Sequence, residues 1–190
     1  MEPRKLIKIM GLAEKLKNVP RHSYTTTGRV ESVAEHCWRL CLMSYFVRDE
    51  FPEADMEKVM LMCLVHDFGE AFTGDIPAFE KTSDHEKTEA AVINDWLNTL
   101  PHTYRKELRD LFDEMEQRTT VEAKLFKALD NMEALIQHNE ADIDTWLPLE
   151  YDLQLTYGVS NSEFSEYTKA LRKQVSDDSV AKIKAHNEKL

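Results

Sequence analysis

The chain has 190 residues, a formal net charge of −11 at pH 7, 42% hydrophobic and 31% charged residues, and five glycines. This length suits one domain with a substantial core, and the composition is typical of a soluble, mainly helical protein. The negative charge disfavours binding to nucleic acid or to anionic membranes. Because no apolar run is long enough to cross a bilayer and the N-terminal residues lack the apolar segment of a signal peptide, we expect a cytoplasmic protein.

The first segment combines a helix with an irregular stretch. Apolar residues from Leu6 to Leu16 recur at helical spacing, which predicts an amphipathic helix over residues 3–17. Residues 18–28 follow no period and are rich in turn formers, so we expect a long loop. Within this loop Arg21 is the residue best suited to bind a phosphate, and a solvated arginine is the alternative interpretation.

A second helix is predicted from a capping-box pattern that runs from Ser32 to Glu35. The apolar spacing continues to about residue 49 and predicts one buried face. His36 lies on that face. Taken alone, such a histidine is either a hydrogen-bonded core residue or a metal ligand.

The third predicted helix, over about residues 54–69, carries the most informative residues of the sequence. Its apolar run surrounds the whole helix, so the pair His66 and Asp67 near its end is expected to lie deep. Burying an imidazole beside a carboxylate costs free energy unless the two are partnered or hold a metal. Glu70 follows at i+4 from the histidine and i+3 from the aspartate, which places another carboxylate beside any ion bound there.

Three further helices are predicted before residue 138, namely about 83–98, opened by a capping box from Ser83 to Glu86, then 104–116, and one that begins at residues 119–122. Asp130 stands among apolar residues on the last of them. A buried aspartate is improbable without a cation or several donors. Asp130 therefore either pairs with Lys127 or contributes to an ion site.

The C-terminal part is less regular. Residues 138–161 are acidic, and we expect loops with short helical turns that cover a site or supply a dimer contact. Residues 162–190 are typical of two amphipathic helices rich in lysine and glutamate. No repeat or domain boundary is evident, so the sequence predicts an all-α, single-domain protein.

The helices together supply a candidate metal site. His36, His66, Asp67 and Asp130 bring two imidazoles and two carboxylates from three predicted helices. A mixed nitrogen and oxygen set suits one divalent transition-metal ion, such as Mn, Co, Fe, Ni or Zn, better than Ca or a thiolate-preferring ion. Such an ion would activate water and neutralise phosphoryl charge.

This pattern on an all-helical chain resembles the HD-domain metal-dependent phosphohydrolases. Its most specific part is the stretch His66-Asp67-x-x-Glu70-x-x-Thr73-Gly74-Asp75-x-Pro77-x-x-x-Lys81, which is similar to the signature of the bacterial 5′-deoxynucleotidase branch and its eukaryotic relatives. The resemblance implies a single HD-type helical bundle over residues 1–190, with a core of about 5–175 and a helical tail of about 176–190. It also implies that the four-residue set holds one divalent ion.

The resemblance further implies a role for each matching residue. Glu70 would orient or deprotonate the attacking water and protonate the leaving sugar oxygen. Thr73 and Asp75 would address the sugar, with Asp75 accepting from the 3′-hydroxyl, while Arg21 and Lys81 would bind phosphate. The implied activity removes the 5′-phosphate of deoxyribonucleoside or ribonucleoside 5′-monophosphates.

One departure from the family pattern bears on the substrate. Relatives often carry tryptophan immediately after the arginine, whereas this chain has His22. The difference affects both the alignment of Arg21 and the steric exclusion of a 2′-hydroxyl. The guanosine tetraphosphate hydrolases carry Glu-Asp after the histidine-aspartate pair, and Ala71 after Glu70 disfavours that branch.

Two alternative functions stay open at this stage. One is an HD-type phosphohydrolase that acts on another phosphomonoester or on a nucleotide pyrophosphate. The other is a non-catalytic metal-binding scaffold, against which Glu70 and Asp75 argue because a scaffold needs neither. Apolar stripes on an otherwise acidic surface, together with the family tendency, predict a homodimer.

Overall fold

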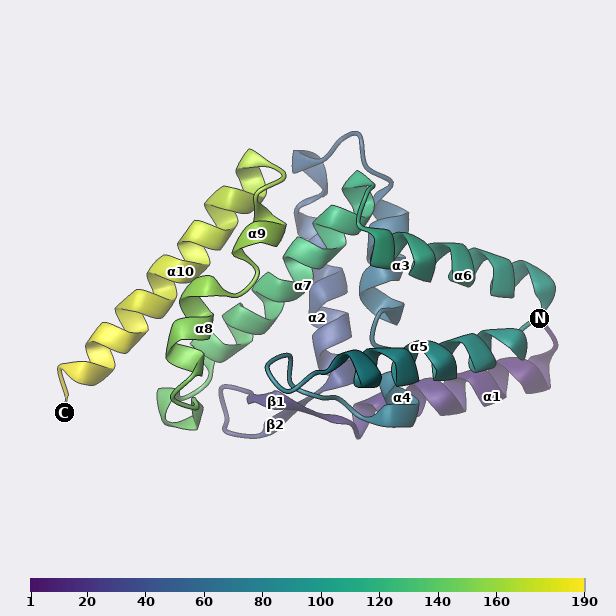
Figure 1. The fold of residues 1–190 in the computed structure, drawn as a ribbon, viewed down its shortest axis with the longest axis horizontal. Coiled ribbons are helices and arrows are strands. Elements are labelled where there is room, and N and C mark those ends of the chain that lie inside the picture. The colour runs from purple at the N-terminus through teal and green to yellow at the C-terminus, as the bar shows by residue number, and fades with distance from the viewer. Residues whose placement is uncertain (190) are drawn as a thin grey trace.

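Helices make up most of the chain in the computed structural model, which describes residues 1–189 (Figure 1). The all-α prediction is confirmed, with the addition of one small hairpin. With η for 3-10 helix, the elements in chain order are α1 (Pro3–Ala13), η1 (Glu14–Lys17), β1 (Pro20–Tyr24), β2 (Val30–Ser32), α2 (Val33–Phe46), η2 (Arg48–Glu50), α3 (Met56–Val65), α4 (Glu70–Thr73), α5 (Ser83–Asn98), α6 (His102–Gln117), α7 (Val121–Glu140), η3 (Ile143–Thr145), α8 (Glu150–Thr156), α9 (Val159–Ser162) and α10 (Glu166–Asn187).

Helix α7 is the central element of the bundle. It runs between α2 and α3 on one side and α8 to α10 on the other (Figure 1). A helix that buries residues around most of its circumference must be covered by neighbours on several sides. The fully buried side chains of α7 include Leu125, Leu129 and Met132. Whatever polar group α7 carries at this level is therefore held inside the protein.

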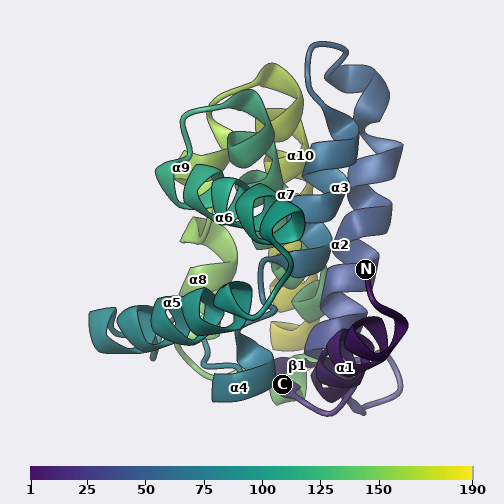
Figure 2. The same cartoon turned by 90° about the vertical axis from the view of Figure 1, so that its right-hand side faces the viewer.

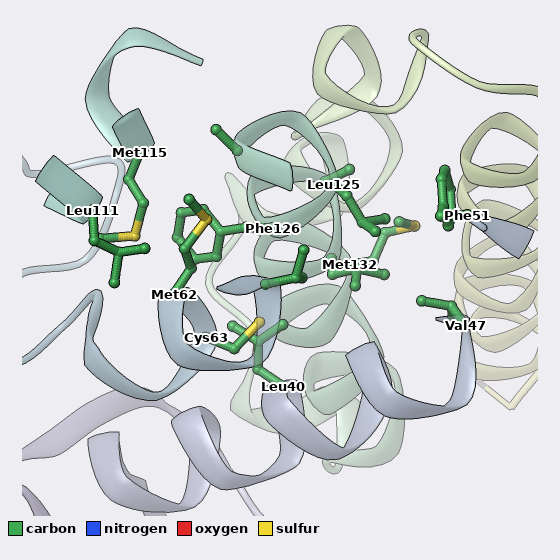
Figure 3. Packing of buried hydrophobic residues seen from close by; sticks show 14 residues of the cluster. Leu40, Val47, Phe51, Met62, Cys63, Leu111, Met115, Leu125, Phe126 and Met132 are labelled. Carbon is green, nitrogen blue, oxygen red and sulfur yellow. The ribbon is translucent and has the colours of Figure 1, made fainter. Parts of the chain in front are cut away.

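The main hydrophobic core joins α2, α3, α6 and α7 (Figure 3). Leu40 from α2, Met62 from α3 and Met132 from α7 are 0%, 0% and 1% exposed. Burying side chains of this size stabilises a fold by about 1.5–3 kcal/mol each. This packing fixes the three helices that carry the candidate metal ligands relative to one another.

A second apolar cluster supports the other end of the site. In Figure 2, α2 and α3 run side by side, and α1, α4 and α5 gather at one end of the molecule. There Phe68 packs on Trp96, with ring centroids 4.4 Å apart. A Cβ atom on Gly69 would lie 2.8 Å from the Glu89 side chain and 3.1 Å from that of Ile93. Glycine therefore permits the close approach of the turn before α4 to α5.

The capping box that begins α2 forms as the sequence predicts. The Ser32 N–H donates to Glu35 Oε2 at 2.8 Å, and the Glu35 N–H donates to Ser32 Oγ at 3.4 Å. The helix ends at Phe46, before the predicted residue 49, and η2 continues the chain. Because the cap sets the first turn, it also sets the direction in which His36 points.

The prediction of a loop over residues 18–28 is wrong. Residues 20–24 form β1, which pairs antiparallel with β2 through a turn that contains Gly28 at a φ of +78°. Strands this short carry too little alternation to be recognised from the sequence. The Gln137 side chain of α7 donates to Tyr24 O at 2.7 Å and holds the hairpin against the bundle.

Several helix boundaries also differ from the prediction, and one pair of predicted helices is a single helix. The first helix is α-helical only to residue 13, and the third stops at residue 65, so that residues 66–69 form a turn before α4. The capping box of α5 lies one residue earlier than predicted, from Thr82 to His85, because the ring of His85 accepts the Thr82 N–H. The C-terminal region forms one helix, α10, in place of two, since its polar middle contains neither glycine nor proline.

Residues 138–161 contain the end of α7 and the short elements η3, α8 and α9, in agreement with the expected helical turns. No helix within residues 1–189 is long and apolar enough to span a membrane.

The displaced cap of α5 gives a direct test of the fold. We expect Thr82→Ala to lower the free energy of unfolding by about 1 kcal/mol, because it removes an N-cap acceptor, and to lower the Tm by about 2–4 °C. The matched control is Ser83→Ala, which changes the first helical residue and not the cap. Thermal unfolding followed by circular dichroism measures both; a larger loss in the Ser83 variant would contradict the assigned cap.

Candidate functional site

The four predicted metal ligands converge where α2, α3 and α7 meet. His36 comes from α2, His66 and Asp67 from the turn after α3, and Asp130 from α7. The His36 Nε2 atom lies 3.2 Å from Asp130 Oδ1 and 3.3 Å from His66 Nε2. His66 Nε2 lies 3.0 Å from Asp67 Oδ2. Because their helices share one core, these residues form a compact cluster although 94 positions separate the first from the last.

The hydrogen bonds around the two imidazoles leave suitable donor atoms for an ion. The Nδ1 atom of His36 bonds Glu133 Oε2, and the Nδ1 atom of His66 lies 3.1 Å from Cys63 O. A proton on each Nδ1 leaves the Nε2 lone pairs directed at one another. An ion bound at about 2.0–2.2 Å by nitrogen and oxygen separates neighbouring donors by about 3.0–3.5 Å. The observed spacing therefore fits a divalent transition-metal ion.

Glu133 is a site residue that the sequence analysis missed. Its side chain is 1% exposed and lies against His36 on the side away from the proposed ion. An outer carboxylate of this kind fixes the orientation of a ligand imidazole and raises its basicity. The available signal was its position, three residues after Asp130 and within the apolar stretch of α7.

Asp130 pairs with Lys127, as one of the two interpretations of its sequence position predicts, and its other oxygen faces the candidate metal site. Lys127 Nζ donates to Oδ2 at 2.7 Å, while Oδ1 faces the two histidines. Burial raises the pKa of Asp130, but the positive charge of Lys127 and the imidazoles of His36 and His66, which can donate from Nε2 when no ion is bound, outweigh it and hold the pKa well below its usual value. Asp130 is therefore ionised and has one oxygen available to an ion.

Glu70 lies beside the cluster in an environment short of positive charge. It is 4% exposed, and its Oε2 atom has no hydrogen-bond partner among residues 1–189. Burial, followed by the negative charges of Asp67 and Asp75, raises the pKa of Glu70 to about 10. Three carboxyl groups gathered in this way favour a bound cation, which agrees with the donor geometry.

Arg21 connects the candidate metal site to the neighbouring space. From β1 its Nη1 atom reaches Asp67 Oδ2 at 3.3 Å and Asp75 Oδ1 at 4.0 Å. Glu31, which the sequence analysis also missed, lies 3.4 Å from Arg21 Nε and accepts a hydrogen bond from Ser23 Oγ at 2.7 Å. The hairpin thus holds a guanidinium group beside the candidate metal site, where it could contact an anionic substrate.

A pocket of about 130 Å³ opens beside Arg21 and Asp75. Residues from 138 to 157 form much of its wall. The pocket is lined by Arg21, His22, Ser23, Asp75, Pro77, Ala78, Phe79, Ala134, Leu135, His138, Glu150, Leu153, Gln154 and Tyr157. Its mixture of apolar, aromatic and polar side chains is typical of a small-molecule site.

Thr73 and Lys81 do not line this pocket. The Thr73 hydroxyl donates to the backbone carbonyls of Gly69 and Gly74 at 3.4 and 3.1 Å. Lys81 Nζ pairs with Glu89 Oε2 at 2.6 Å. Both residues border a separate surface depression that also includes Glu70.

Comparisons with known proteins agree with this geometry. A family model described as HD domain matches residues 13–172, which include the four-residue cluster. The 5′-deoxynucleotidase HDDC2 of Homo sapiens is 33% identical over 141 residues, covering 72% of this chain and 68% of that protein. Its counterpart in Danio rerio is 35% identical over 140 residues, with 71% and 68% covered. The crystal structure of a predicted metal-dependent phosphohydrolase from Magnetospirillum magnetotacticum MS-1 is similar with a TM-score of 0.78 and 26% identity, covering 93% of each chain.

The contact between Glu133 and His36 predicts an effect on metal binding. Glu133→Gln keeps the size of the side chain but removes its negative charge, so we expect metal affinity to fall by about 10- to 100-fold. Glu140→Gln is the matched control, because Glu140 lies on the same helix and pairs with Arg39 at the surface. Competition with a chelator measures both affinities, and equal affinity in the Glu133 variant and the unaltered protein would contradict the role.

Proposed function

Because this chain belongs to the HD-domain phosphohydrolases, we propose that it removes the 5′-phosphate of nucleoside 5′-monophosphates, with deoxyribonucleotides as the preferred class. The observation that carries the proposal is the junction between two features. A compact set of nitrogen and oxygen donors lies next to Arg21 and Asp75, and these two residues also line the pocket. The similar proteins of Homo sapiens and Danio rerio are 5′-deoxynucleotidases, which supports the same substrate class.

One divalent ion, of Mn, Co, Fe, Ni or Zn, is proposed at His36, His66, Asp67 and Asp130. When bound, an ion of this kind lowers the pKa of a coordinated water and neutralises phosphoryl charge. The donor spacing and the inward-facing Nε2 atoms support this assignment.

Arg21 is proposed to bind the phosphoryl oxygens. Its planar guanidinium group suits two phosphoryl oxygens at once. Burial lowers the pKa of Arg21, but the surrounding carboxylates of Asp67, Asp75 and Glu31 outweigh this effect. The net pKa lies above its usual value, so the side chain stays charged. A substrate phosphate would take over part of the interaction that these carboxylates now make.

Glu70 is proposed to carry out the proton transfer of the reaction. Attack of water oxygen on phosphorus breaks the bond from phosphorus to O5′, whose electron pair stays on O5′. Glu70 would orient the water and pass a proton to O5′, so that the products are a nucleoside and inorganic phosphate. Its burial beside Asp67 supports this role, because a carboxyl group with a raised pKa can hold a proton near neutral pH.

The remaining substrate contacts are also proposals. Asp75, which lines the pocket, would accept a hydrogen bond from the 3′-hydroxyl of the sugar. Thr73 is proposed to address the sugar and Lys81 the phosphate. For both residues, the present bonds to backbone carbonyls and to Glu89 would have to exchange when substrate binds.

Phosphate release from paired deoxyribonucleoside and ribonucleoside 5′-monophosphates tests the function. Chelated protein resupplied with Mn, Co, Mg or Zn should release phosphate in a metal-dependent manner and faster from the deoxy substrate. Glu70→Gln should lower kcat by about 10²- to 10⁴-fold, as is typical of losing an acid-base group, while metal content stays unchanged. Glu116→Gln, at an exposed position of α6, is the matched control.

Each part of the proposal has its own contradicting outcome. Unchanged turnover in the Glu70 variant would exclude its proton role. Equal release from both sugars would remove the deoxy preference, and no release from any nucleoside monophosphate would contradict the proposed reaction.

We also propose that the protein forms a homodimer through an exposed apolar face of α2 and α3. Trp38 and Phe46 are 63% and 73% exposed, which is unusual for large apolar side chains on an acidic protein. Leu42, Tyr45, Leu61 and Leu64 of the same two helices are also exposed. Exposed apolar side chains on two helices that contact each other suit a symmetric contact between two copies.

A charge placed on this face should separate the two copies. We expect the unaltered protein to have the mass of a dimer by light scattering and Phe46→Glu to have that of a monomer, because the buried charge would be unpaired. Val180→Glu, at an exposed position of α10, is the matched control and should stay dimeric. A monomeric mass for the unaltered protein at tens of micromolar would contradict the proposal.

A further inference from the structure

A second group of metal-binding side chains lies on the pocket wall, and the proposed reaction uses none of them. It consists of His22 from β1, His138 from α7 and Glu150 from α8. Glu150 Oε1 lies 3.2 Å from His22 Nε2 and 2.9 Å from His138 Nε2. One donor atom from each residue lies within 4.8 Å of the other two.

The surroundings hold these side chains in place. Glu150 is 4% exposed, and its second oxygen accepts the Leu147 N–H at 2.6 Å. Trp146 packs beside the His138 ring, with centroids 6.1 Å apart, and donates from Nε1 to the His138 carbonyl at 3.1 Å. Phe79 contacts the His22 ring edge to face at 5.4 Å. Ordered outer contacts of this kind are what fix ligand side chains in metal sites.

Two of the three separations between donor atoms match those of a small tetrahedral ion, and the third is below 4.8 Å. An ion bound at about 2.0–2.1 Å separates tetrahedral donors by about 3.3 Å. The two measured distances from Glu150 Oε1 to the imidazoles are close to this value. Two histidines and one glutamate are also a donor set of zinc sites that keep their fourth position open.

The charge state of the cluster is suitable as well. Burial raises the pKa of Glu150, but the hydrogen bonds from His138 and from the Leu147 backbone, with the nearby charge of His22, lower it below the usual value. Glu150 is therefore an ionised carboxylate. Two imidazoles now direct Nε2 at the same oxygen, and a single divalent ion can replace the two N–H donors there.

We propose that His22, His138 and Glu150 form a second site for a borderline divalent cation, of which Zn²⁺ is the representative. The site is separate from the cluster around His36 in every ligand. All three of its residues line the pocket that Arg21 and Asp75 also line. The proposal depends only on the geometry of these side chains and does not require the chain to be a phosphatase.

Counting bound Zn²⁺ tests the proposal. Full-length protein is stripped with a chelator, dialysed against buffered Zn²⁺ and analysed for metal per chain. We expect two equivalents in the unaltered protein. His22→Phe, which keeps an aromatic ring beside Phe79, and Glu150→Gln, which keeps the side-chain size, should each retain one equivalent and weaken the other by more than about 100-fold, above the loss typical of an outer contact.

Two further variants complete the experiment. His102→Phe alters an exposed histidine outside the pocket and should still bind two equivalents. Asp67→Ala should lose the equivalent at His36 and His66 and keep the second, the reverse of the His22 variant. Thermal unfolding confirms that each variant is folded.

The outcomes distinguish this proposal from the proposed function. One equivalent in the unaltered protein, or two equivalents in both the His22 and the Glu150 variants, would overturn the second site. Absence of phosphate release leaves the metal count unaffected, so failure of the enzymatic proposal would be seen separately.

Discussion

The contact of His36 with two acidic side chains is the interaction on which the rest of the structure depends. Its imidazole is fully buried and lies between Glu133 on one side and Asp130 on the other. Carboxylates at this depth are stable only with hydrogen bonds and compensating positive charge. Lys127 supplies part of that positive charge at Asp130. The inward-facing donor atoms are placed so that a bound ion would supply the rest. The contacts that pack α2, α3 and α7 together therefore also position the donor atoms of the candidate site.

The hairpin extends this arrangement to the pocket. Gln137 of α7 holds Tyr24 by its backbone carbonyl, and this contact fixes the strand that carries Arg21. Without that support a guanidinium group in an acidic environment would have many alternative partners. With it, Arg21 is held between Asp67 and Asp75, where it contacts the candidate metal site and lines the pocket. A small irregular feature of the fold thus positions a central charge of the site.

Local signals in the sequence predict the parts of this structure that have local causes. The capping residues of α2 and the apolar periodicity of α7 indicate the two helices, and Asp130 is visible as a carboxylate in an apolar stretch. The strands β1 and β2 are too short to show an alternating pattern, so the sequence does not reveal the hairpin. Glu133 resembles an ordinary helix glutamate until the fold places it on His36. Residues whose role arises from a neighbour on another helix are the ones that sequence reasoning misses.

The two ends of the site have separate structural origins. The donor cluster comes from α2, α7 and the turn after α3, whereas the far wall of the pocket comes from β1 and the segment that includes α8. In the sequence, His22 is visible only as a departure from the tryptophan that the family resemblance leads us to expect. In the structure, its ring is tied to Glu150 and lies near His138, so this wall is polar where an indole would make it apolar. His22 therefore contributes to the polarity of the pocket wall, while the predicted metal ligands lie on other elements.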